Sequence, residues 1–116
     1  MKVCREFYFD ASHYLPGYKG KCEQFHGHTY RLEVAVEGKQ GKNGMVVDFN
    51  ELKSVVNDSV VEKLDHRNLN EIFENPTAEN IAGWIFSELK KKMNVCSVKL
   101  WEGHGKWVEV SAGDRV

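Results

Sequence analysis

The chain has 116 residues, of which 41% are hydrophobic and 28% charged, and its formal net charge is −1 at pH 7. This length suits one domain, residues 1–116, and the composition excludes a disordered chain. The charge gives no positive field for nucleic acid or an anionic membrane, and no apolar run approaches the roughly 20 residues that span a bilayer. We therefore expect small-molecule partners, no nucleic acid and no membrane.

The beginning of the chain and its cysteines indicate a cytoplasmic protein. The amino terminus starts with a strand-like pattern and not with a signal peptide. Three cysteines, Cys4, Cys22 and Cys96, are an odd number that suits a reducing compartment better than a disulfide framework. We expect at least one free thiol. Cys4 and Cys96 fall within predicted strands, so buried and inert thiols are expected there.

The first third of the chain predicts two strands. From Val3 to His13 alternate residues are mainly apolar, which is the pattern of a strand with one covered face, and His13 extends the inward row. After a loop that contains proline and glycine, a second alternating row runs from His28 to Val36. His26 has the same phase as His28. The sequence thus places three histidines on the inward faces of two strands.

The middle of the chain predicts two helices. A turn over residues 41–44 precedes the short run 45–47, which we expect to complete the long hairpin. Asp48 resembles a helix cap, and apolar residues recur at helical spacing over 49–63. After a loop, a second amphipathic segment begins near Thr77 and ends at three consecutive lysines.

The last part of the chain predicts two further strands. Cys96, Val98, Leu100 and Glu102 alternate with more polar neighbours, so a third strand places the carboxylate of Glu102 on its apolar side. A glycine turn carries His104, which we expect to be exposed, and a last strand follows over 107–110. The order ββααββ predicts an α+β domain with a four-stranded antiparallel sheet and two helices on one face.

Three histidines in phase at strand ends predict a metal site. In His26-Gly27-His28 both imidazoles project to the same side of a strand, and His13 points the same way from the neighbouring strand. Three neutral imidazoles match a catalytic zinc site, which keeps a fourth position open for water or substrate. The alternatives are histidines of the core or surface without a ligand role, and a closed structural site in which Cys22 is the fourth ligand.

Groups suited to proton transfer lie nearby in the sequence. Cys22 precedes His26 by four residues, and a thiol near a metal and basic groups readily loses its proton. In the pair Asp65-His66 the carboxylate can orient the imidazole and raise its basicity, although such pairs are often simply solvated. Glu102 could accept paired hydrogen bonds from a ring with adjacent N–H donors, or form a surface salt bridge.

The stretch from Phe9 to Tyr30, FDASHYLPGYKGKCEQFHGHTY, resembles the 6-pyruvoyltetrahydropterin synthase family, and especially its 6-carboxytetrahydropterin synthase branch in queuosine precursor synthesis. Further matches are GMVVDFNELK at 44–53, LDHRNLN at 64–70, PTAENIA at 76–82 and LWE at 100–102. The resemblance implies the tunnelling fold and a homohexamer, a dimer of trimers. Joining the sheets of neighbouring subunits into a barrel would remove their unpaired edges.

The resemblance also implies roles for individual residues. It assigns the Zn²⁺ ligands to His13, His26 and His28, the catalytic groups to Cys22, Asp65 and His66, and the contacts to the pterin to Glu102 and Thr77. In the family the active site lies between subunits, so a neighbour could supply the Asp65-His66 pair. An isolated subunit would then be inactive.

The implied activity is that of a zinc-dependent carbon–carbon lyase. It converts 7,8-dihydroneopterin triphosphate into 6-carboxy-5,6,7,8-tetrahydropterin, with release of acetaldehyde and triphosphate, in queuosine (7-deazaguanine) biosynthesis. The loop LPGYKGKC favours this carboxy branch over the pyruvoyl branch, which is the alternative. A second alternative is a noncatalytic zinc or pterin-binding module.

A third branch of the family replaces the thiol with a glutamate nearer the histidine pair and cleaves the side chain of dihydroneopterin towards folate. Cys22 is present here and Gln24 stands two residues before His26, which speaks against that branch. Glu23, which adjoins the thiol, keeps it open.

Overall fold

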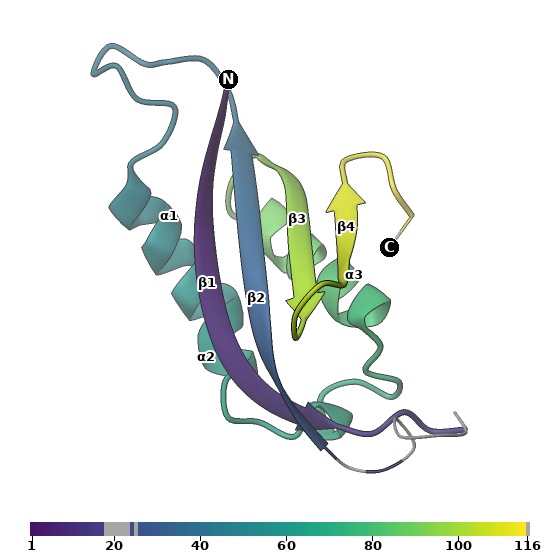
Figure 1. Ribbon diagram of the computed structural model, residues 1–116. Helices are drawn as coiled ribbons and strands as arrows, with labels where there is room; N and C mark the ends of the chain where they lie inside the picture. The colour runs from purple at the N-terminus through teal and green to yellow at the C-terminus, as the bar shows by residue number, and fades with distance from the viewer. Residues whose placement is uncertain (18–23, 25, 116) are drawn as a thin grey trace.

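The computed structural model describes residues 1–17, 24 and 26–115, which form one antiparallel sheet with helices on one face (Figure 1). The strands are β1 (Lys2–His13), β2 (His26–Glu37), β3 (Val95–Glu102) and β4 (Trp107–Ser111), in the spatial order β1-β2-β3-β4. The helical segments are α1 (Phe49–Val56), the π-helix η2 (Asn57–Val61), α2 (Glu62–Leu64), the 3-10 helix η3 (Leu69–Glu71) and α3 (Ala78–Lys90). The predicted α+β fold and its ββααββ order are confirmed.

The hairpin of β1 and β2 is the longest feature of the sheet. The two strands pair over their whole length, from Lys2 opposite Glu37 to His13 opposite His26. Figure 1 shows that both strands curve and run well beyond the ends of β3 and β4. At the place where β3 ends, Glu102 pairs with Tyr30. The hairpin therefore carries its histidines to one end of the sheet, where β3 contributes a single carboxylate.

The core lies between the inward face of the sheet and the helices. Its residues come from alternate positions of the strands and from one stripe of each helix, such as Leu32 in β2, Leu52 in α1 and Ile85 in α3, all fully buried. Burial of a side chain of this size contributes on the order of 1.5–3 kcal/mol. The same alternation that fills the core with Phe7 and Phe9 continues to His13, which is also fully buried.

The residues immediately before α1 and α3, Asp48 and Thr77, cap these helices, as the sequence predicts for Asp48. The side chain of Asp48 accepts a hydrogen bond from the backbone of Asn50 at the start of α1. Thr77 does the same for Asn80 at the start of α3. Such caps satisfy amide groups that have no partner within the helix.

Two local predictions were wrong, the strand at 45–47 and the buried thiols. Residues 45–47 form no strand; they belong to the irregular connection that leads to Asp48. Cys4 is exposed because it lies in the outward phase of β1, and Cys96 is only partly buried. The helix predicted over 49–63 is confirmed as an unbroken helical segment, within which η2 is a π-helical turn.

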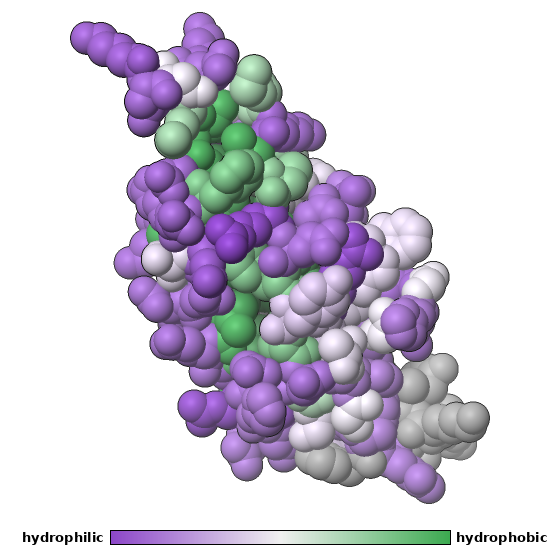
Figure 2. All heavy atoms as spheres, turned by 60° about the vertical axis from the view of Figure 1, so that its left-hand side comes forward, coloured by the Kyte–Doolittle hydropathy of each residue, from purple (hydrophilic) through white to green (hydrophobic). Residues whose placement is uncertain are grey.

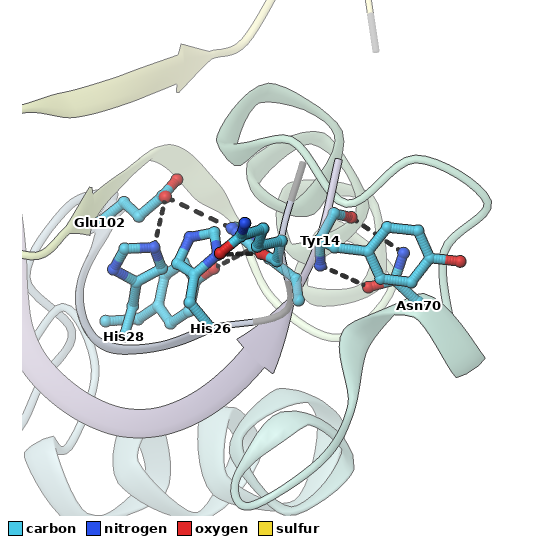
Figure 3. A network of polar contacts seen from close by, with 8 residues as sticks. Tyr14, His26, His28, Asn70 and Glu102 are labelled. Atoms are coloured by element: carbon cyan, nitrogen blue, oxygen red, sulfur yellow. Dashed lines mark hydrogen bonds and ion pairs between the residues drawn. The ribbon is translucent and has the colours of Figure 1, made fainter. Parts of the chain in front are cut away.

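The loop after α2 covers part of the free edge of β1. The amide of His66 donates to the carbonyl of Asp10, and the amide of Ser12 donates to the carbonyl of Arg67. Further along, Tyr14 and Asn70 exchange two hydrogen bonds, seen in Figure 3. Towards the other end of the strand, Figure 2 shows an apolar strip along the side of the molecule where β1 and α1 lie.

Among the described residues, no helix has both the length and the apolar character needed to cross a bilayer.

Candidate functional site

Three imidazoles meet at the end of the β1–β2 hairpin. The ring centroids of His13 and His26 are 4.7 Å apart, those of His13 and His28 are 5.1 Å apart, and those of His26 and His28 are 4.5 Å apart. Glu102 completes the group, since one ligand atom from each of the four residues lies within 4.8 Å of the others. Figure 3 shows the rings of His26 and His28 side by side next to the carboxylate of Glu102.

The strand register explains this convergence. His13 lies directly opposite His26, and His28 lies opposite Ala11 on the same face. Side chains two residues apart on a strand project to one side, so both histidines of β2 join the row that contains His13. The last residue of β3, Glu102, enters the group from the neighbouring strand. The sequence phase predicted all four positions.

Burial keeps two of the imidazoles neutral. Loss of solvation lowers the pKa of His13 and of His28, and the carboxylate of Glu102 only partly opposes this effect. The Nε2 atoms of His13 and His28 lie 3.5 and 2.9 Å from Oε1 of Glu102. Neither nitrogen has a hydrogen bond with the geometry required among the described residues. Neutral imidazoles with unpaired nitrogens are suited to bind a metal ion.

The ring of His26 is oriented through its other nitrogen. Its Nδ1 lies 2.6 Å from the carbonyl oxygen of Gln24, which can only accept a hydrogen bond. Nδ1 therefore carries a proton, which leaves Nε2 as the nitrogen that could face a metal. Such a contact from the second ring nitrogen is the usual way in which a protein orients a metal-binding histidine.

Asp65 and His66 form a second, more exposed group. Oδ1 of Asp65 lies 3.0 Å from Nδ1 of His66, and the side chain of His66 is 80% exposed. The amide of Asp10 donates to the same Oδ1 at 3.0 Å. This hydrogen bond, together with His66, lowers the pKa of Asp65. The backbone of His66 has a φ of 59°, a left-handed conformation that is uncommon for residues other than glycine.

A shallow hollow of about 500 Å³ is lined by residues of both regions. Its lining includes His28 from β2 and the loop residues His66 and Arg67, together with outward residues of β1.

The remaining predicted site residues have different outcomes. Cys22 lies outside the described residues, as does Glu23. The hydroxyl of Thr77 caps α3. His104 is exposed, as predicted, and does not belong to either group.

Two residues near the site were not singled out from the sequence. The hydroxyl of Tyr30 lies 3.0 Å from Nδ1 of His13, and its phase, two residues after His28, could have indicated this. The side chain of Asp10 accepts a hydrogen bond from Thr29 and lies close to Asp65 and His66. Asp10 is in the outward phase of β1, and its contact with the loop arises only from tertiary structure.

An antiparallel sheet with helices on one face, and histidines grouped at the strand ends, defines a candidate metalloenzyme of the tunnelling-fold class. The family model of 6-pyruvoyl tetrahydropterin synthase matches residues 2–113. This chain belongs to that family.

Similar proteins carry more than one name within this family. A protein of Archaeoglobus fulgidus, provisionally named 6-carboxy-5,6,7,8-tetrahydropterin synthase, is 50% identical over 88% of each chain. The 6-carboxy-5,6,7,8-tetrahydropterin synthase of Haemophilus influenzae is 37% identical over 87% of this chain and 92% of its own. The dihydroneopterin monophosphate aldolase of Pyrococcus furiosus is 48% identical over 88% of this chain and 90% of its own.

The fold is shared with a solved structure of the family. The 6-pyruvoyl tetrahydropterin synthase of Caenorhabditis elegans superposes with a TM-score of 0.88, at 29% identity, over 97% of this chain and 96% of that structure.

Proposed function

We propose that this chain is a zinc-dependent 6-carboxy-5,6,7,8-tetrahydropterin synthase, a lyase that acts on 7,8-dihydroneopterin triphosphate. The observation that carries the proposal is the convergence of His13, His26, His28 and Glu102, whose ligand atoms lie within 4.8 Å of one another. The reaction consumes one water and releases acetaldehyde and triphosphate. The relatives from A. fulgidus and H. influenzae support this choice of product.

His13, His26 and His28 would hold the metal. Three imidazole donors suit zinc and leave a coordination position for a ligand. When bound, zinc would lower the pKa of the hydroxyl groups on the substrate side chain and stabilise the negative charge that develops on their oxygens. Burial supports this role, because it keeps His13 and His28 in the neutral form that binds a metal.

Glu102 and Thr77 would bind the pterin ring. A carboxylate at a strand end can accept two hydrogen bonds from adjacent N–H groups of the ring. Glu102 lies next to His28, so a ring bound there would be held against the metal site. The hydroxyl of Thr77 accepts a hydrogen bond from the helix and still has its own proton to donate.

Cys22, Asp65 and His66 would move protons along the substrate side chain. A thiol near a metal is readily deprotonated, and Asp65 holds the imidazole of His66 through its Nδ1. With Nδ1 engaged by the carboxylate, Nε2 of His66 would exchange protons with the substrate.

The exposure of His66 supports a homohexameric assembly, in which a neighbouring subunit closes the site. Acid–base groups are more effective when water is excluded from them. Apart from the part that pairs with the loop after α2, no described residue pairs with the edge of β1, so that another strand could add there. The apolar strip of Figure 2 lies along the same side. We place the enzyme in the cytoplasm and in queuosine biosynthesis.

A second candidate function is the aldol cleavage of dihydroneopterin monophosphate. The P. furiosus relative with that name is 48% identical to this chain, and Glu23, next to Cys22 in the sequence, offers a carboxylate for proton transfer. The two activities leave different products. Aldol cleavage of the monophosphate keeps the phosphate ester on the released aldehyde, whereas the synthase releases acetaldehyde and free triphosphate.

The test is a product analysis with both substrates. Zinc-loaded protein is incubated with dihydroneopterin triphosphate and, separately, with dihydroneopterin monophosphate, and the aldehydes, phosphates and pterins are quantified. The proposal predicts acetaldehyde, triphosphate and the carboxylated pterin in equal amounts from the triphosphate. A pyruvoyl product without acetaldehyde would assign the pyruvoyl branch, and a phosphorylated aldehyde from the monophosphate would assign the aldolase.

The Cys22→Ala variant separates catalysis from metal binding. We expect turnover to fall by about 10²–10⁴-fold, the range for one acid–base group, while zinc content is unchanged. Loss of zinc together with activity would instead indicate a closed site in which the thiol is a permanent ligand.

A further inference from the structure

Tyr30 contacts the histidine cluster from within the core. Its hydroxyl oxygen lies 3.0 Å from Nδ1 of His13, and both side chains are fully buried. Tyr30 follows His28 by two residues, so it shares the inward face of β2. Among the residues that the structure describes, it is the one side chain that forms a hydrogen bond with an imidazole of the cluster from the side opposite Glu102.

The position of the Tyr30 hydroxyl is fixed by packing. Its ring stacks on Phe9 with centroids 5.0 Å apart and an interplanar angle of 10°. A stacked and fully buried ring has little freedom to move, which makes its oxygen a rigid reference point for the imidazole of His13.

His13 needs such a reference point because its two ring nitrogens face different surroundings. Nε2 lies 3.5 Å from Glu102, towards the other histidines, and has no hydrogen bond with a described residue. Nδ1 faces Tyr30. A neutral imidazole carries one proton, and a metal requires the lone pair of the nitrogen that faces it. If Nδ1 carries the proton and donates a hydrogen bond to the oxygen of Tyr30, the lone pair of Nε2 is directed at the centre of the cluster.

His26 shows the same arrangement with a different acceptor. Its Nδ1 contacts the carbonyl oxygen of Gln24, which requires a proton on Nδ1. Two of the three imidazoles thus have an oxygen at Nδ1, a carbonyl for His26 and a phenol for His13. The backbone of Pro76 also contacts the imidazole of His13, so the test must show which contribution comes from the phenol. A phenol oxygen is removable by substitution, whereas a carbonyl is not.

We infer that Tyr30 is a positioning residue of the metal centre, whose hydroxyl oxygen accepts a hydrogen bond from Nδ1 of His13 and thereby fixes its tautomer and ring orientation. The inference rests on the proposed function, since it assumes that the histidine cluster binds a metal. Tyr30 itself does not touch the metal or the substrate.

The test compares the wild type with Tyr30→Phe, which keeps the stacked ring and removes only the hydroxyl. Zinc affinity is measured by competition with a chromophoric chelator, and nitrogen-15 NMR of the imidazoles gives the tautomer of His13 in the zinc-loaded and metal-free proteins. The matched control is Tyr8→Phe, because Tyr8 lies on β1 but is 59% exposed. Thermal unfolding checks that each variant is folded.

We expect Tyr30→Phe to bind zinc about 10–100-fold more weakly, the effect typical of a lost partner of a metal ligand, and to show mixed tautomers of His13 without metal. Tyr8→Phe should match the wild type in both measurements. Equal zinc affinity and an unchanged tautomer in a folded Tyr30→Phe protein would overturn the inference. So would a wild-type, zinc-loaded protein in which Nδ1 of His13 carries no proton, a result that does not depend on the variant. If the wild-type protein bound no zinc, the proposed function itself would be refuted.

Discussion

The two histidine-containing regions of this molecule are built in opposite ways. His13, His26 and His28 lie on the paired strands β1 and β2, at the end of the core, and their ligand atoms lie within 4.8 Å of one another. His66 lies on a loop, has a left-handed backbone and exposes 80% of its side chain. The difference teaches that one chain brings the histidine cluster together by itself, while Asp65 and His66 are presented at the surface.

The comparison has a physical basis in what holds each region. The cluster is positioned by a strand register and by buried contacts, which cannot shift without disturbing the core. The Asp65-His66 pair is held by two hydrogen bonds to the backbone of Asp10 at the edge of β1, one accepted by the side chain of Asp65 and one donated by the amide of His66. The histidine cluster is therefore suited to bind a metal in an isolated chain. The exposed Asp65-His66 pair is suited to complete a site together with the surface of another subunit.

The largest expected effect comes from removing a ligand of the cluster. We predict that His28→Ala lowers zinc affinity by at least about 100-fold. Loss of a residue that only hydrogen-bonds to a metal ligand costs up to about 100-fold, so loss of a ligand itself should cost at least as much. Equilibrium dialysis against zinc measures this directly. The matched control is His104→Ala, since His104 is exposed and lies outside the cluster. If His28→Ala and His104→Ala lost zinc equally, or if neither variant lost zinc, the cluster would not be the metal site.

An intermediate effect is expected from neutralising the exposed pair. Asp65→Asn keeps an oxygen that can accept from the amide of Asp10, but it removes the charge that supports His66. We predict a fall in turnover of about 10²-fold or more, in line with loss of assistance to an acid–base group, with full zinc content. Steady-state kinetics and metal analysis of the same sample provide the check. A variant that loses zinc would show that the two regions are not independent.

The smallest effect concerns stability against pH. The pKa of Asp65 is lowered in the folded protein, mainly because the amide of Asp10 donates to its carboxylate. The ionised side chain therefore stabilises the fold above its unfolded pKa of about 4, and this contribution is lost as the pH falls through the lower, folded pKa.

Chemical denaturation of metal-free protein at a series of acid pH values measures this contribution. On acidification, the free energy of unfolding should fall more steeply for the wild type than for Asp65→Asn. The difference in this free energy between the two proteins should therefore become smaller at low pH. Parallel curves for the two proteins would mean that the carboxylate is not held in the way described.

Much of the fold and of the cluster could be predicted because both follow from side-chain alternation. The phase that buries Phe9 also directs His13 inward, and the phase of Leu100 does the same for Glu102. This rule does not say which outward residue a distant loop will contact. It therefore missed Asp10, whose role arises from the return of residues 65–68 to the edge of β1.

Other errors have equally local causes. Cys4 lies in the outward phase of its strand, and assigning it to the core because it lies within a strand ignored the two-residue period. The π-helical turn at 57–61 has no clear signature in an amphipathic pattern, since one extra residue per turn shifts the stripe only slightly. Tyr30 was placed on the correct face, but its hydrogen bond to His13 requires the registration of two strands.

The coordination of the bound metal tests the account most directly. X-ray absorption spectroscopy of the zinc-loaded wild type distinguishes nitrogen from sulfur ligands and gives their distances. We predict imidazole nitrogens at about 2.0–2.1 Å, a light-atom ligand in the remaining position, and no sulfur. A zinc–sulfur distance near 2.3 Å in the resting protein would show that Cys22 closes the site, and would contradict a catalytic centre with an open position.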